Sequence, residues 1–163
     1  MNKQNTFKDA RNYNALLLVK SAKNKLKNKN YMGALKDANK AIELNNKLSS
    51  AYFIRGEIYS SIDQYTQMAK LEIYENSLKN YNEAIKYDTN SYESFEGRGK
   101  LYFKKKKYDS AKSDFSKAII LTYSSELILN PDPLDPLPLI RLSLFDKRGR
   151  AHYHLSQFKN AIM

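Results

Sequence analysis

Cysteine is absent from the 163 residues of the chain. Without it the chain can form no disulfide, no thiolate zinc site and no cysteine nucleophile. No apolar run approaches the roughly eighteen residues that a membrane-spanning helix needs, and the polar start, residues 1–14, lacks a secretory signal. We therefore expect no membrane insertion and a cytoplasmic protein, with the nucleus as the alternative compartment.

Glycine and proline are scarce, with five and four residues respectively. All four prolines fall within 131–138, and the chain before that window contains none. So few turn-forming residues cannot provide the turns that an all-β fold of this length needs. Apolar residues recur at helical spacing instead, for example along 62–85. The sequence predicts an all-α protein.

Basic residues outnumber acidic ones, 28 to 17, for a net charge of +11. This balance favours acidic partners, although drift toward A/T-rich codons is an alternative origin for many of the lysines. Lysines gather in 20–29 and 104–107, where two predicted helices end. Cations there oppose the helix dipole, worth about 0.3–1 kcal/mol each. The alternative is an anion-binding rim at one edge of the molecule.

Two patterns recur along the chain. An aromatic residue, Arg-Gly and a second ring align in 52–59, 95–102 and 145–152. A small residue and a later alanine follow at helical spacing, as in 34–42 and 111–119. Together they resemble the tetratricopeptide repeat, in about three and a half copies over 15–163. The resemblance implies a right-handed superhelical array of antiparallel helix pairs, a TPR-like α-solenoid.

The repeat assigns small residues to the point where the two helices of a pair cross. On the first helices these residues are Ala22, Gly56, Gly99 and Gly149. On the second helices they are Ala34, Ser77, Ala111 and Ala161. His152 occupies a ring position of the repeat, and we expect it in the core.

The spacing of the repeats predicts the organisation of the chain. The second copy has nine extra residues, so we expect its first helix to pass Ser60 and its second to start near Gln64, capped by Asp63. The helix before the prolines should reach about Ile128. The predicted segments are a polar N-terminal segment (1–14), repeats 15–48, 49–91 and 92–125, a helix end with a Pro-rich loop (126–141), and a truncated repeat (142–163). The truncation suggests a fragment of a longer protein that self-associates through this last repeat.

Nothing in the sequence indicates an enzyme. His152 and His154 are two residues apart on a predicted helix and point to different sides, whereas helical metal ligands stand three or four apart. The carboxylates form no paired-acid pattern. We expect no catalytic residue, no metal and no cofactor.

The resemblance implies a peptide-binding groove lined by the first helices of the pairs. Carried onto this chain, the groove positions are Val19, Lys20, Lys23, Lys27, Phe53, Ile54, Glu57, Glu96, Lys100, Phe103, Lys104, Asp146, Lys147, Arg150 and Tyr153. This set is mixed apolar and basic, so we predict a protein ligand that is acidic with apolar anchors. The alternative is that the N-terminal segment or the Pro-rich loop fills this groove.

Co-chaperones of this family grip the terminal carboxylate of chaperone tails ending in Glu-Glu-Val-Asp. Three of the required polar positions are occupied here by Ile54, Glu93 and Gly97, and Lys20 and Asn24 lie one residue out of register. We therefore do not expect specific binding of such a tail. The predicted function is a protein-interaction scaffold. Its alternatives are a co-chaperone adaptor with another ligand mode and an RNA-binding basic array, which the assignment of most tyrosines to the core disfavours.

Overall fold

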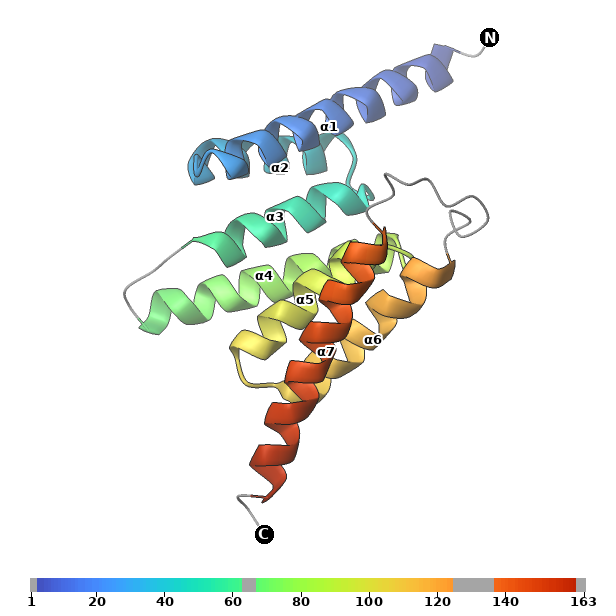
Figure 1. Cartoon of the computed structure of the whole chain (residues 1–163). Helices are drawn as coiled ribbons and strands as arrows, with labels where there is room; N and C mark the ends of the chain where they lie inside the picture. Colours follow the sequence, from blue (N-terminus) through green and yellow to red (C-terminus); the bar gives the residue numbers. More distant parts are fainter. Residues whose placement is uncertain (1–2, 63–66, 125–136, 161–163) are drawn as a thin grey trace. The chain divides into compact units, whose positions relative to one another are not determined.

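The computed structural model describes residues 3–62, 67–124 and 137–160, which form helices joined by short connections. The chain divides into two compact units, Met1–Thr89 and Asn90–Met163. The helices of the first unit are α1 (Lys3–Lys27), α2 (Tyr31–Leu44), α3 (Ser49–Ser61) and α4 (Gln67–Tyr87), and those of the second are α5 (Tyr92–Lys104), α6 (Tyr108–Ser124) and α7 (Leu137–Asn160) (Figure 1). The all-α prediction is confirmed. Within the described residues, none of the helices combines the length and apolar character that a membrane crossing requires.

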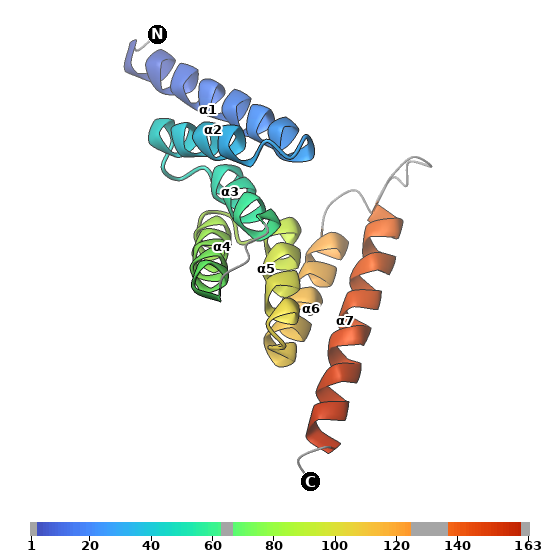
Figure 2. The same ribbon diagram turned by 90° about the vertical axis from the view of Figure 1, so that its left-hand side faces the viewer.

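In the first unit α1 and α2 run antiparallel, side by side (Figure 2). Because α1 has 25 residues and α2 only 14, the N-terminal half of α1 projects past its partner (Figure 1). Alanines allow the two backbones to approach closely. The core formed with α3 contains Ala22, Ala34, Ala38, Ile54 and Ile58.

The turn that ends the first helix of a pair has the same geometry in both units. Lys29 and Lys106 each adopt φ 58°, in the left-handed region where glycine is the usual residue. The N–H of the next residue then bonds to the carbonyl oxygen five residues earlier, at 2.9 Å in both turns. This shared turn is a structural sign of the repeat, with lysine in the role of glycine.

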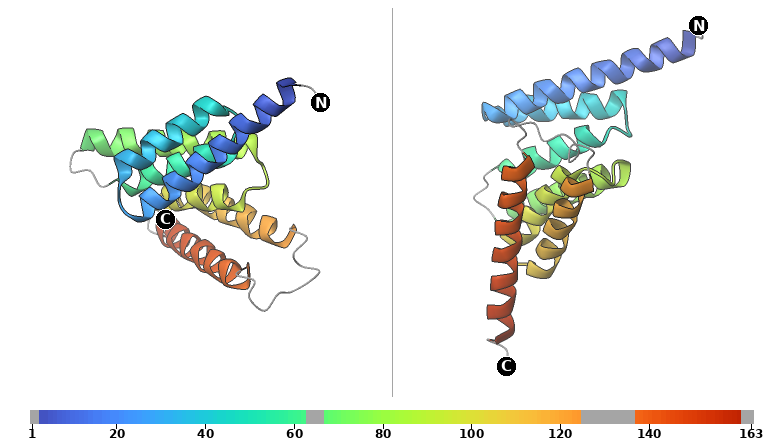
Figure 3. Two further views of the ribbon diagram at one scale, coloured as in Figure 1. Left: turned by 90° about the horizontal axis from the view of Figure 1, so that it is seen from above. Right: turned by 45° about the vertical axis from the view of Figure 1, so that its right-hand side comes forward.

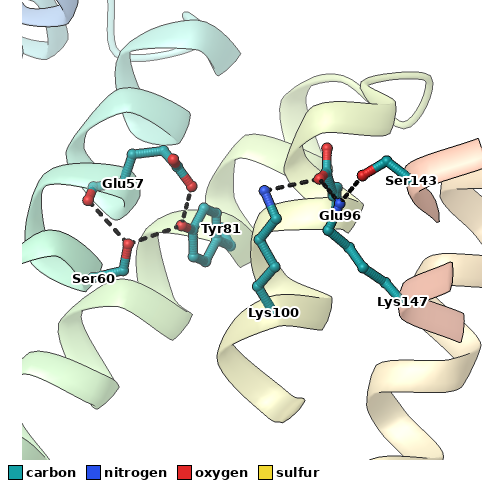
Figure 4. Close-up of polar contacts among 7 residues, drawn as sticks. All are labelled: Glu57, Ser60, Tyr81, Glu96, Lys100, Ser143 and Lys147. Carbon is teal, nitrogen blue, oxygen red and sulfur yellow. Dashed lines mark hydrogen bonds and ion pairs between the residues drawn. The ribbon is translucent and has the colours of Figure 1, made fainter. Parts of the chain in front are cut away.

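A glycine on the first helix meets a ring of the second helix in two of the pairs. A Cβ placed on Gly56 would lie 3.1 Å from the ring of Tyr81, and one on Gly99 would lie 2.7 Å from Phe115. Both rings are about 1% exposed. The predicted close crossings at Gly56 and Gly99 are therefore confirmed. The crossing on α3 is further fixed by the Tyr81 hydroxyl, which donates to Glu57 at 2.5 Å (Figure 4).

Each helix pair also contains a polar contact next to its crossing. A carboxylate or amide on the second helix accepts hydrogen bonds from side chains of the first helix. It stands one residue before Ala38, Tyr81 or Phe115. The contacts join Asp37 to Lys25 and Ser21 (both 2.6 Å), Asn80 to Arg55 (2.7 Å), and Asp114 to Arg98 (two bonds of 2.8 Å). Burial raises the pKa of Asp37, but Lys25 and Ser21 outweigh it and hold this pKa below its ordinary value. Hydrogen bonding to Asp114 raises the pKa of Arg98.

In the second unit α7 packs along α6, and the two helices lie side by side in Figures 2 and 3. The residues that α7 buries are Leu144, Ala151 and Leu155. They stand seven and four residues apart, so they form one stripe of the helix. The opposite side of α7 is exposed.

The first two helix pairs differ from the prediction in their boundaries. α1 begins at Lys3 rather than near Ala15, because no Gly or Pro precedes Gly33 to interrupt the helix. α3 ends at Ser61 with 13 residues, as many as α5, while α4 has 21. The extra length of the second repeat therefore belongs to α4 rather than to both helices. The predicted cap at Asp63 and start at Gln64 lie outside the described residues.

The fourth repeat differs most. α7 begins at Leu137, inside the predicted loop, and Pro138 sits in its first turn, where a missing N–H breaks no helical bond. The helix then continues to Asn160 without the turn expected before a second helix. A Cβ on Gly149 would meet nothing within 4 Å, and His152 is exposed. The predictions of a close crossing at Gly149 and of a core position for His152 are wrong, because no described helix covers this side of α7. Ile128 and Ala161 lie outside the described residues.

The two glycines provide a matched test of the crossing. Gly99→Ala places a methyl group against Phe115, and this overpacking should lower the free energy of unfolding by about 1–3 kcal/mol. The higher helix propensity of alanine offsets part of that loss. Gly149→Ala meets open space and should raise it by about 0.5–1 kcal/mol. Urea unfolding of both variants measures the difference. Equal losses in the two variants would show that a helix does pack on Gly149.

Asp114 provides a test of the polar contact. Asp114→Ala removes the carboxylate from a guanidinium that is mostly buried, and we expect a loss of about 3 kcal/mol in the free energy of unfolding. Asp109→Ala, an exposed acid in the first turn of the same helix, should cost no more than about 1 kcal/mol through the helix dipole. If the two variants had equal thermal midpoints, the contact between Arg98 and Asp114 would not contribute to stability.

Candidate functional site

The second unit contains a cavity of about 500 Å³ between α5, α6 and α7. Two aromatic rings and four cationic side chains line it. We call it the α5–α7 cavity, and its lining residues are Lys100, Phe103, Lys104, Phe115, Lys147 and Arg150. Its volume lies in the range of about 300–1,000 Å³ that is common for ligand sites.

Helical spacing places these side chains together. On α5, Lys100, Phe103 and Lys104 stand three and four residues apart and therefore share a face. On α7, Lys147 and Arg150 stand three apart. Phe115 comes from α6, and the absence of a side chain on Gly99 lets its ring sit against α5. The crossing of α5 and α6 thus supplies an apolar wall to the cavity.

A carboxylate of the chain itself, that of Glu96, pairs with two of the four cations of the cavity. The Oε1 atom of Glu96 lies 2.8 Å from the Nζ atom of Lys100 and 3.1 Å from that of Lys147 (Figure 4). Burial raises the pKa of Glu96, but the two lysines outweigh it, so this pKa is lowered and the carboxylate is charged at neutral pH. Lys104 and Arg150 have no carboxylate partner among the described residues. The Arg150 guanidinium lies 5.6 Å from the centre of the Phe103 ring.

A cluster of rings adjoins the cavity. His154 of α7 stacks on Tyr108 with 5.1 Å between ring centres and meets Phe103 edge-on at 5.6 Å. Beyond this cluster, a second hollow of about 630 Å³ includes Lys106 and Lys107 in its lining. His154 therefore joins α7 to α5 by ring contacts. In the part of the chain that the structure describes, no group of His, Asp and Glu is arranged to hold a metal ion.

Five of the predicted groove residues meet in this cavity, namely Lys100, Phe103, Lys104, Lys147 and Arg150. Tyr153 does not line it; its side chain is 60% exposed, and its ring meets His154 edge-on. The prediction did not include Phe115, which is both a buried core residue and a wall of the cavity.

The groove residues predicted in the first unit have mixed environments. Ile54 is only 4% exposed and belongs to the core, so it is closed to a ligand. Val19 packs against the same core, Phe53 lies 6.2 Å from the Tyr81 ring, and Glu57 accepts the Tyr81 hydroxyl. The exposed members are Lys20, Lys23 and Lys27, all on α1. A continuous groove through both units stays a prediction.

Comparison with known proteins assigns the fold. No family model matches the chain, and no curated protein matches it. Solved structures do match: the first TPR domain of human RPAP3 has a TM-score of 0.65 at 16% identity, covering 91% of this chain and 97% of that one. The first TPR of Spaghetti (RPAP3) bound to the HSP90 peptide SRMEEVD gives 0.64 at 16%, covering 89% and 95%. PcrH in complex with the chaperone-binding region of PopD gives 0.60 at 16%, covering 90% and 92%. The chain has the TPR fold.

Proposed function

We propose that the chain is a protein-interaction module whose second unit binds an acidic segment of a partner protein, with an apolar side chain of that segment inserted into the α5–α7 cavity. The observation that carries the proposal is the pairing of two rings, Phe103 and Phe115, with four surrounding cations in one cavity. The module acts by binding rather than by catalysis.

The apolar part of the cavity suits an anchoring side chain. Phe115 is buried against Gly99, and Phe103 packs against the rings of Tyr108 and His154. Rigid walls require little ordering when a ligand enters. Burying one Leu or Phe side chain contributes about 1.5–3 kcal/mol, enough to make it the dominant contact of a short segment.

The cations of the cavity favour acidic residues on either side of the ligand's apolar anchor. Among the described residues, Lys104 and Arg150 form no ion pair with a carboxylate, so a carboxylate from the ligand would gain two partners at low desolvation cost. Such rim charges mainly govern the association rate and its salt dependence. The excess of basic residues over the whole chain adds long-range attraction for acidic segments.

The structural neighbours are consistent with this kind of ligand. Two of the matched domains are bound to a peptide or to a chaperone-binding region of another protein. Their identity to this chain is low, so they support peptide binding as the mode without identifying a partner.

A synthetic peptide tests the cavity. The probe is a nine-residue, end-capped peptide of Glu and Ser with a central Phe, and its binding is measured by amide NMR and calorimetry. We expect changes in the amide chemical shifts of the residues that line the cavity. Replacement of the central Phe by Ala should weaken binding by the same factor at low and high salt. Lys104→Gln should weaken it about threefold to fivefold at 0.1 M salt and much less at 1 M, because the Debye length falls from about 10 Å to about 3 Å.

The matched control for charge is Lys117→Gln, which removes an exposed lysine of α6 that does not line the cavity. It should leave the affinity within about a factor of two. Shifts confined to Lys106 and Lys107, with no effect of Phe replacement, would move the site to the lysine-rich turn and contradict the proposal.

A chaperone tail should not be a specific ligand. Ile54 is buried and supplies no hydrogen-bond donor, Gly97 has no side chain, and Glu93 is an exposed carboxylate that repels a terminal one. A peptide ending in Met-Glu-Glu-Val-Asp should therefore bind no better with a free terminal carboxylate than as its amide. Calorimetry that found a micromolar complex lost on amidation would overturn this prediction and favour the co-chaperone alternative.

A further inference from the structure

A single carboxylate oxygen connects the two helices that face each other across the cavity. Lys100 on α5 and Lys147 on α7 both reach Oε1 of Glu96, and Lys147 also donates to the hydroxyl of Ser143 (Figure 4). The side chain of Glu96 is 18% exposed, that of Lys147 25% and that of Lys100 51%. The contact lies at the edge of the cavity, where solvent and a ligand can reach it.

Two of the four cations of the cavity are therefore already occupied by a carboxylate of the chain itself. A ligand carboxylate would need the same two ammonium groups, since charge-assisted bonds to them are the strongest polar contacts that this side offers. Both carboxylates cannot hold both lysines at these distances, because like charges in so small a space repel each other.

We propose that Glu96 is an internal competitor: it occupies the place of a ligand's acidic group on Lys100 and Lys147, and an acidic segment displaces it on binding. The proposal rests on the proposed function of the α5–α7 cavity. A segment with one acidic group is held by Lys104 and Arg150 alone. A segment with acidic groups on both sides of its apolar anchor gains the second pair of cations only by displacing Glu96. Glu96 thereby determines specificity for multiply acidic ligands.

A purely structural role for Glu96 predicts the opposite result. If its only task is to tie α5 to α7, its removal loosens the cavity and weakens binding. If it competes with the ligand, its removal frees two cations and strengthens binding. The sign of the change in affinity therefore separates the two roles.

The test uses the same nine-residue peptide, with Glu96→Gln and a matched control, Glu93→Gln. Both variants raise the net charge by one, but Glu93 is exposed in the first turn of α5 and has no lysine partner among the contacts described. We expect Glu96→Gln to bind about fivefold more tightly than wild type at 0.1 M salt, the effect of about one partly exposed ion pair. Glu93→Gln should stay within about a factor of two.

A second measurement needs no variant. Carbon NMR of the Glu96 carboxyl group in the wild-type protein should show its pKa rising toward the ordinary range when the peptide saturates the cavity, because both lysines are taken away. Peptide binding with an unchanged Glu96 pKa, or equal or weaker binding by Glu96→Gln, would overturn the competitor role and leave the proposed function standing. If neither the wild-type protein nor the Glu96→Gln variant bound the peptide at the residues that line the cavity, the proposed function itself would be wrong.

Discussion

The close crossing of α5 and α6 at Gly99 is the contact on which the second unit depends. Because Gly99 has no side chain, the Phe115 ring lies directly against α5, where a Cβ would be only 2.7 Å away. That approach brings Arg98 within hydrogen-bond reach of Asp114 and closes the apolar wall of the cavity. One packing contact thus serves stability and the candidate site together, so a substitution that separates these helices removes both.

The same design in the first unit leads to a different outcome. Tyr81 replaces Phe115 opposite Gly56, and its hydroxyl needs a partner, which Glu57 provides. One oxygen of the Glu57 carboxylate is then engaged by the tyrosine, and the role of Glu57 in a groove stays a prediction. A single oxygen atom on the ring therefore changes the role of a carboxylate one residue away from the crossing.

The repeat pattern predicted the crossings because glycine at a fixed distance from a ring has one physical reason, the lack of room for a side chain. It failed at Gly149 because a pattern shows which face of a helix can receive another helix, not whether one is present. The start of α1 at Lys3 was missed because the repeat begins later than the helix, whose residues have no breaker to stop them. The polar contacts of Asp37, Asn80 and Asp114 share one register, which the mainly apolar repeat pattern does not include.

For the site, three transferred groove positions on α5 share one helix face and line a cavity, and their role in binding stays a prediction. Ile54, by contrast, is buried in the core. In the sequence, an apolar residue on a helix face is equally consistent with a buried core position and with a ligand groove. Only the position of the neighbouring helix distinguishes the two. Charge is more informative, since a lysine or arginine is rarely buried without a partner. The four cations of the cavity were thus the predictable part of the site. Glu96 pairs with Lys100 and Lys147 and leaves Lys104 and Arg150 open to a ligand. This division depends on α7 lying opposite α5, which the residue spacing within either helix does not predict.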